Sequence, residues 1–208
     1  MIRTIRGRAK KVAFICSYSP RKCGIATFTS DLVHNMSLAG GAEFEPLVIA
    51  MQSGPELKYE KPVRLKIHKD VRYDYVRAAD FINFSAVDIV CVQHEFGLFG
   101  GEGGSHLNLL LRRLNKPVIT TLHTVLEKPA AEYFNSLVDV CEASAKVIVM
   151  NKRGINMLRA VYDVPRDKME LIPHGIPDLP FADSSYWSAP VFGPCVMRVF
   201  HTCSPCLE

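Results

Sequence analysis

The sequence predicts an α/β protein, built on a parallel sheet with helices on both of its faces. Short, continuous apolar runs alternate along the chain with stripes of apolar residues at helical spacing. This alternation is typical of strands buried on both sides and of the helices that cover them. Loops rich in Gly, Pro and polar residues follow the apolar runs. With 208 residues, 48% of them apolar, the chain can bury one sizeable core.

The candidate strands are short apolar segments. The first, at 12–16, is continuous and apolar, whereas the segment at 63–67 alternates as an exposed or edge strand does. Residues 169–172 lead into a loop. The remaining candidate strands are 44–51, 87–92, 118–122 and 146–150.

Between these segments, apolar residues recur three or four positions apart, and each such stripe predicts one helix. The five stripes are Ile25, Phe28, Leu32 and Met36; Tyr75, Ala78, Ala79 and Ile82; Leu107, Leu110, Leu111 and Leu114; Tyr133, Phe134, Leu137, Val138 and Cys141; Ile155, Leu158 and Tyr162.

Composition argues for a globular protein of a reducing compartment. The net charge of +4 is spread along the chain, so we expect no nucleic-acid partner. No apolar run reaches the roughly 18 to 20 residues that span a bilayer, and the basic residues at 3–11 read as a solvated lead-in. Cys16, Cys91 and Cys141 lie inside apolar runs, which is typical of buried free thiols. We therefore expect a cytoplasmic protein without a transmembrane segment.

The segment 18–31 joins the first predicted strand to the first predicted helix. Pro20 and Gly24 flank the basic pair Arg21 and Lys22. A Gly lets backbone amides approach a ligand, and the helix that follows adds free N–H groups and its positive dipole end. This is the pattern of an anion site, with a well-capped turn that binds nothing as the alternative.

Further polar loops follow other strands, and in a parallel sheet such loops meet at one edge. His123 follows a buried strand, where its imidazole either donates to a substrate or satisfies a loop carbonyl. His94 and Glu95 are candidates for acid–base chemistry or metal ligation, although neighbours on a strand point to opposite faces. The glycines at 97–104 are interpreted as a flexible surface connector, and His174 lies in the last loop.

Several familiar site patterns are missing from the sequence. There is no P-loop, no dinucleotide fingerprint and no Gly-x-Ser-x-Gly elbow. Cys23 beside two basic residues is a minor redox or nucleophile hypothesis. A zinc site near the C-terminus is the alternative to a disordered tail there; its residues would be Cys195, His201, Cys203 and Cys206.

Taken in order, these segments resemble the N-terminal domain of retaining GT-B glycosyltransferases of the group-one type, glycosyltransferase family 4. The resemblance covers about residues 10–182. It implies a Rossmann-like domain that faces a second such domain across a cleft. The segments that carry it are 20–31, 94–104, 120–124 and 172–178.

The resemblance also implies roles for the loop residues. His123 would be the catalytic residue, in contact with the transferred sugar or the acceptor, and the backbone amides of Gly24 and Ile25 would meet the donor diphosphate. Cys23 stands where many members have Gly. The full set of expected donor- or substrate-binding residues is Cys23, Gly24, Ile25, His94, Glu95 and His174. No metal and no cofactor are expected beyond the nucleotide-sugar donor itself, and the expected acceptor is a sugar or polysaccharide.

Residues 1–182 are expected to form this domain, and 183–208 a linker and irregular tail. The second domain of the family finds no counterpart in the sequence, so we expect a truncated or frame-shifted copy, or half of a split enzyme, with little activity alone. A separate subunit that carries the second domain is then a candidate partner. The alternatives are a non-catalytic Rossmann-like binding module that works with a partner subunit, and a metal- or redox-active protein.

Overall fold

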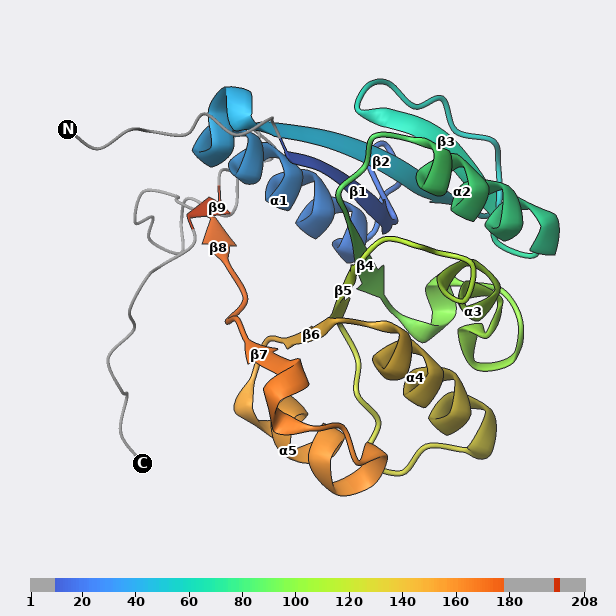
Figure 1. Ribbon diagram of the computed structural model, residues 1–208, viewed down its shortest axis with the longest axis vertical. Helices are drawn as coiled ribbons and strands as arrows, with labels where there is room; N and C mark the ends of the chain where they lie inside the picture. The colour runs from blue at the N-terminus through green and yellow to red at the C-terminus, as the bar shows by residue number, and fades with distance from the viewer. Residues whose placement is uncertain (1–9, 178–196, 199–208) are drawn as a thin grey trace, which may run out of the picture.

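The computed structural model describes residues 10–177 and 197–198 (Figure 1). Its centre is a seven-stranded sheet in which all paired neighbours run parallel, in the order β3-β2-β1-β4-β5-β6-β7. A short antiparallel pair, β8 (Ile176–Pro177) with β9 (Met197–Arg198), lies outside it. The seven strands are β1 (Lys10–Cys16), β2 (Phe44–Gln52), β3 (Val63–His68), β4 (Ile89–His94), β5 (Val118–Leu122), β6 (Lys146–Val149) and β7 (Met169–Leu171).

The helices fall where the apolar stripes predict them. They are α1 (Gly24–Gly40), α2 (Arg72–Phe84), α3 (His106–Leu111), α4 (Ala131–Ala143) and α5 (Lys152–Tyr162), with single 3₁₀ turns η1 (Gly41–Glu43), η2 (Phe96–Leu98), η3 (Glu102–Gly104) and η4 (Arg166–Lys168). The predicted α/β fold with a parallel sheet is therefore confirmed. The predicted tail, 183–208, falls outside the described residues except for β9.

The strand order reverses at β1. The chain runs outward from β1 to β2 and β3, then returns to β4 on the other side of β1. Because such crossovers are right-handed, α1 lies on one face of the sheet and the remaining helices on the other. Figure 1 shows α1 on the opposite side of the strands from α2, α3 and α4. The prediction of helices on both faces is confirmed, although one face carries α1 and the other carries α2 to α5 among the described residues.

Packing at β6 shows the same division. Val147 and Val149 pack with Leu158 of α5 in one buried cluster, whereas Ile148, between them, borders a groove beside α1. Successive residues of a strand point to opposite faces, so α5 lies on the face away from α1. In the part of the chain that the structure describes, no helix is long and apolar enough to cross a membrane.

The stripe predicted for α1 lies beside a groove rather than in the core. The buried residues of α1 are Ala26, Thr29 and Val33, one position on from the predicted set. Among the described residues α1 is the only helix on its face, and one flank of it overlooks the β5–β7 half of the sheet. An apolar groove of about 220 Å³ lies there. Its lining includes Phe28, Leu32, Met36, Thr121, Ile148 and Ile172.

The glycines after β4 are structural. Gly103 and Gly104 are buried at φ values of 58° and 79°, where L side chains are strained. A Cβ on Gly103 would lie 2.5 Å from the Glu132 carbonyl oxygen at the start of α4. Phe96 and Phe99 of the same loop are buried as well. The interpretation of this segment as a flexible surface connector is wrong, because it packs tightly against its neighbours.

Replacement of Gly103 therefore tests this packing. We expect Gly103→Ala to lower the free energy of unfolding by about 2 kcal/mol or more, since the new Cβ meets backbone at a strained φ. Gly97→Ala is the matched control, because a Cβ on Gly97 meets nothing within 4 Å. Urea unfolding of both variants measures the difference, and equal losses would contradict the packing argument.

Candidate functional site

The polar loops gather at the carboxyl edge of the sheet. β1 and β4 are neighbours at the point where the strand order reverses, and open α/β sheets bind their ligands there. The backbone N–H of His123, just after β5, donates to the carbonyl of His94 at the end of β4 over 3.0 Å. This bond fixes the loop after β5 against that of β4, so His123 has a defined place beside the reversal point.

His123 is held as a neutral imidazole. Its Nε2 donates to Oε1 of Gln93 at 2.9 Å. Burial, and to a lesser extent the neighbouring charge of His174, lowers the pKa of His123 to about 4. With Nε2 occupied by the amide, the lone pair on Nδ1 remains to accept a hydrogen bond. At neutral pH the ring therefore offers a polar group without a positive charge.

Phe28 joins three elements at this point. Its ring meets His123 edge-on at 5.0 Å between centroids and His174 at 5.1 Å. Phe28 lies one helical turn after Gly24 in α1, so His123 from β5 and His174 from the segment after β7 both reach the first turns of that helix. The structure thus brings together residues that the sequence analysis selected separately.

Cys23 caps the N-terminus of α1 with its sulfur. Sγ accepts from the Ala26 N–H at 3.4 Å and also contacts Ser17 Oγ at 3.1 Å. Thiols are weak hydrogen-bond partners, so this cap binds the first amides less firmly than a Ser or Asp would. The N-terminal turn of a 17-residue helix is left with N–H groups available to an anion.

Gly24 is exposed, and a Cβ placed on it would meet no atom within 4 Å. Neither its φ nor the packing of the described residues requires a glycine there. The space over the amide is open. Nearby in the same loop, Arg21 Nη1 is buried without a hydrogen-bond partner among the described residues. Buried guanidinium nitrogens are rarely left so, and a bound anion is one natural partner.

His94 lies in the interior, away from the cleft. Its side chain is fully buried, with its ring edge-on to Phe96 at 5.1 Å and stacked on Phe99 at 5.9 Å. Neither ring nitrogen has a hydrogen-bond partner in the described part of the chain, and burial lowers the pKa of His94 to about 3. The predicted contact of His94 with a substrate stays a prediction, for which this conformation offers no exposed atom.

Glu95 connects two loops of the site. Its carboxylate accepts from Thr124 Oγ1 at 2.5 Å and from the Phe96 N–H at 3.0 Å. No hydrogen bond joins His94 to Glu95. The ring of His94 packs in the interior, whereas the carboxylate of Glu95 bonds to the loop after β5. Among the described residues no group of three or more His, Cys, Asp or Glu is placed to hold a metal ion. The terminal Cys and His residues of the zinc alternative lie outside the described residues.

A cavity of about 410 Å³ adjoins His123. It lies between the loop after β5 and the first turn of α5, where Asn151 caps the helix by accepting from the Gly154 N–H at 2.7 Å. Arg153 pairs with Glu127 at its rim over 2.8 Å. The lining mixes backbone and polar groups with Leu122, Val149 and Met157. Such a surface suits a polar ligand with apolar faces, as a sugar ring has.

Sequence reasoning did not single out Gln93, Thr124 or the site role of Phe28. Gln93 immediately precedes His94 at the end of a strand and therefore points to the opposite face, where His123 lies. This alternation of side chains along a strand was the signal in the sequence that could have identified Gln93. Phe28 was placed in a helical stripe, and nothing in the sequence indicated which ring it would meet.

A doubly wound parallel sheet with an open helix N-terminus, a half-buried imidazole and a cavity at its carboxyl edge defines a ligand-binding domain of the Rossmann-like class. The sequence profile of "Glycosyltransferase Family 4" matches residues 23–178. The chain therefore belongs to glycosyltransferase family 4. A comparison with curated protein sequences gave no match.

Solved glycosyltransferases share the fold at low sequence identity. An alpha-glucosyltransferase in complex with UDP and a 13-mer DNA superposes with a TM-score of 0.56 at 9% identity, over 81% of this chain and 42% of that one. A glycosyltransferase from Rickettsia africae gives 0.54 at 15% identity, over 81% and 44%. This chain spans less than half of each. Since one of these structures holds DNA, the expectation of no nucleic-acid partner gains no support from them.

The imidazoles of the buried His94 and the half-buried His123 make stability depend on pH. In the unfolded chain both bind a proton near their ordinary pKa of 6.5, whereas in the folded chain His123 does so near 4 and His94 near 3. The unfolded state therefore binds more protons between these values, and the free energy of unfolding falls on acidification below about pH 6.5.

His94→Phe tests the larger of these two effects. It keeps an aromatic ring of similar shape but removes two unpartnered nitrogens, so we expect equal or higher stability at neutral pH. Between about pH 7 and 4.5 the variant should lose about 1–3 kcal/mol less than the wild type. Urea unfolding at both pH values measures this, and parallel losses would contradict it.

His174→Ala tests the electrostatic effect of His174 on His123. The pKa of His123 should rise, because the charge of His174 lowers it, yet stay below 6.5, because burial is the larger cause. An NMR titration of the His123 ring gives the value. His34→Ala, an exposed site on α1, is the control that should leave it unchanged. An unchanged His123 pKa in His174→Ala would show that the two rings are uncoupled.

Proposed function

We propose that this domain forms one wall of the cleft of a sugar-nucleotide-dependent glycosyltransferase. The N-terminus of α1 receives the diphosphate of the donor, and His123 lies beside the transferred sugar. The observation that carries the proposal is the convergence of the open Gly24 turn and the half-buried, neutral His123 on the first turns of one helix. Family membership gives the class of reaction, and the whole enzyme's activity is part of the proposal.

The diphosphate fits the α1 N-terminus on three grounds. The helix dipole and free amides attract an anion. Gly24 presents no side chain to hold a phosphate off. The unpartnered Nη1 of Arg21 supplies a cation in the same loop. Because charge accumulates on the leaving diphosphate as the bond to the sugar breaks, these groups stabilise the transition state more than the ground state.

His123 suits a position next to the reacting carbon. Positive charge develops on a sugar ring as its leaving group departs, and a protonated imidazole there would oppose it. The depressed pKa keeps His123 neutral, and Gln93 fixes its orientation. We propose that Nδ1 accepts a hydrogen bond from a sugar hydroxyl and that His123 positions the ring, in a reaction that proceeds with retention and without a metal.

The acceptor has its place in the cavity between the β5 loop and α5. This cavity adjoins His123, so an acceptor hydroxyl held there reaches the same reacting carbon. Glu95, through Thr124, holds one wall of it. The donor's nucleoside lies on the far side of the diphosphate, where a second domain completes the cleft in this proposal. On its own the 208-residue chain is then expected to bind donor but turn it over poorly.

Gly24→Ala separates ligand binding from folding. The added methyl meets no protein atom, and Ala is a better helix former than Gly, so stability should be unchanged or slightly higher. Affinity for a nucleoside diphosphate should fall about tenfold or more, because the methyl occupies the path of the phosphate.

The probes are UDP, GDP and ADP, titrated into the purified 208-residue chain by calorimetry or NMR. Gly97→Ala, equally exposed and equally free of clashes, is the control that should bind as the wild type does. If Gly24→Ala binds every tested diphosphate as tightly as the wild type, the diphosphate does not lie over this turn and the proposed cleft is wrong.

A further inference from the structure

The outer surface of α2 carries a narrow stripe of four residues that the site does not use. Tyr73, Arg77, Asp80 and Phe84 follow one another at spacings of four, three and four, which places them on a single line along the helix. Tyr73 is 68% and Phe84 93% exposed, and the side chains of Arg77 and Asp80 are 51% and 46% exposed. We call these four residues the α2 stripe.

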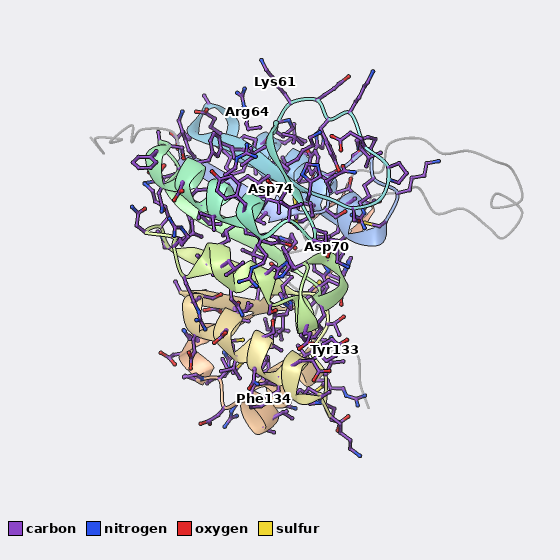
Figure 2. All side chains as sticks on the ribbon, turned by 90° about the vertical axis from the view of Figure 1, so that its right-hand side faces the viewer. Lys61, Arg64, Asp70, Asp74, Tyr133 and Phe134 are labelled. Carbon is purple, nitrogen blue, oxygen red and sulfur yellow. The ribbon has the colours of Figure 1, made fainter. Side chains whose placement is uncertain are left out.

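The stripe lies opposite the buried face of α2, so it points into solvent. Figure 2 looks onto this side of the molecule, where α2, marked by the label of Asp74, lies at the surface beside α3. None of the four residues contacts His123, Phe28 or the α1 N-terminus through an interaction found in the structure. A partner on this surface would therefore leave the carboxyl-edge site open.

We propose that the α2 stripe is a contact between two copies of this chain, with the two α2 helices packed antiparallel about a twofold axis. The stripe reads aromatic, cation, anion, aromatic along the helix. When one copy is reversed against the other, Tyr73 meets Phe84 of the second copy and Arg77 meets its Asp80. The twofold axis repeats both contacts, giving two aromatic pairs and two ion pairs.

The order of charges selects this arrangement. A parallel pair of helices would place Arg77 against Arg77 and Asp80 against Asp80, which is repulsive. Sliding the antiparallel pair by one turn would separate the opposite charges and leave the aromatic rings unpaired. Tyr, Phe and Arg are also the residue types that are enriched at protein interfaces.

The two charged residues of the stripe already have partners within their own chain. Arg77 lies 3.3 Å from Asp74, and Asp80 lies 3.4 Å from Arg113. The Asp80–Arg113 pair is long and solvent-exposed, and such pairs contribute little. In the Arg77–Asp74 pair the Asp74 side chain is only 8% exposed, so this pair is partly buried. Asp80 is free to reorient toward a second copy, and Arg77, with five N–H donors, can keep its bond to Asp74 and meet a second carboxylate as well. A contact made through one helix from each copy is small, so we expect association in the micromolar range.

Sedimentation equilibrium of the full chain from about 5 to 500 μM tests the contact. The wild type should show a monomer–dimer equilibrium, and Phe84→Ser should weaken it about tenfold or more. Leu38→Ser is the matched control: Leu38 is 66% exposed on α1, away from the stripe, and its loss should leave the dimer unchanged. A wild type that stays monomeric throughout, or a dimer that Phe84→Ser leaves intact, overturns the proposal.

Charge exchange gives a second test, read from the recovery of association in variants whose far-UV circular dichroism matches that of the wild type, since Arg77 also pairs with the buried Asp74. Arg77→Asp makes the centre of the stripe acidic and Asp80→Arg makes it basic, so each variant alone should associate about tenfold or more weakly. An equimolar mixture should restore association by forming heterodimers, and so should the double variant Arg77→Asp/Asp80→Arg. If the mixture associates no better than either variant alone, Arg77 and Asp80 do not meet across the interface and the antiparallel arrangement is wrong.

Discussion

The position of β1 between β2 and β4 is the constraint on which the rest of the structure depends. Its residues Val12 to Cys16 are buried on both sides, and it pairs in parallel with both neighbours. Because the chain leaves β1 in one direction and returns in the other, right-handed connections send α1 to one face and the later helices to the opposite face. Burial of one strand thus determines both the layers and the edge at which the polar loops meet.

The same constraint explains the character of the site. In the part of the chain that the structure describes, no second helix lies on the face of α1. The start of α1 is therefore open beside the strand ends, and the rings of His123 and His174 contact it through Phe28. A side-chain hydrogen bond fixes each polar group of the site: Gln93 accepts one from His123, and Thr124 donates one to Glu95. The first contact joins strand β4 to the loop after β5, and the second joins the loops after β4 and β5, so the sheet holds the polar loop residues in place.

Much of this architecture was predictable from the sequence, because continuous apolar runs and helical stripes are local signals of burial. His123 and Gly24 were identified by their position after strands. The glycines at 97–104 were wrongly interpreted as a flexible connector. What requires glycine there is the close approach of the α4 backbone, which comes much later in the chain and leaves no signal in the segment itself. His94 could not be placed either. Its isolation among Phe96 and Phe99 depends on how two loops pack, which strand periodicity does not encode.

The two edges of the sheet carry a consequence for assembly. The edge strand β3 bears Arg64 and Lys66, and the opposite edge, β7, is three residues long with Glu170 at its centre. Strands that end a sheet are templates for pairing with another chain, and charges or short length discourage it. Pairing of β3 with its own copy would bring cations together, and β7 offers few backbone groups. Strand addition, the common route to fibrous aggregates, is therefore disfavoured at both edges.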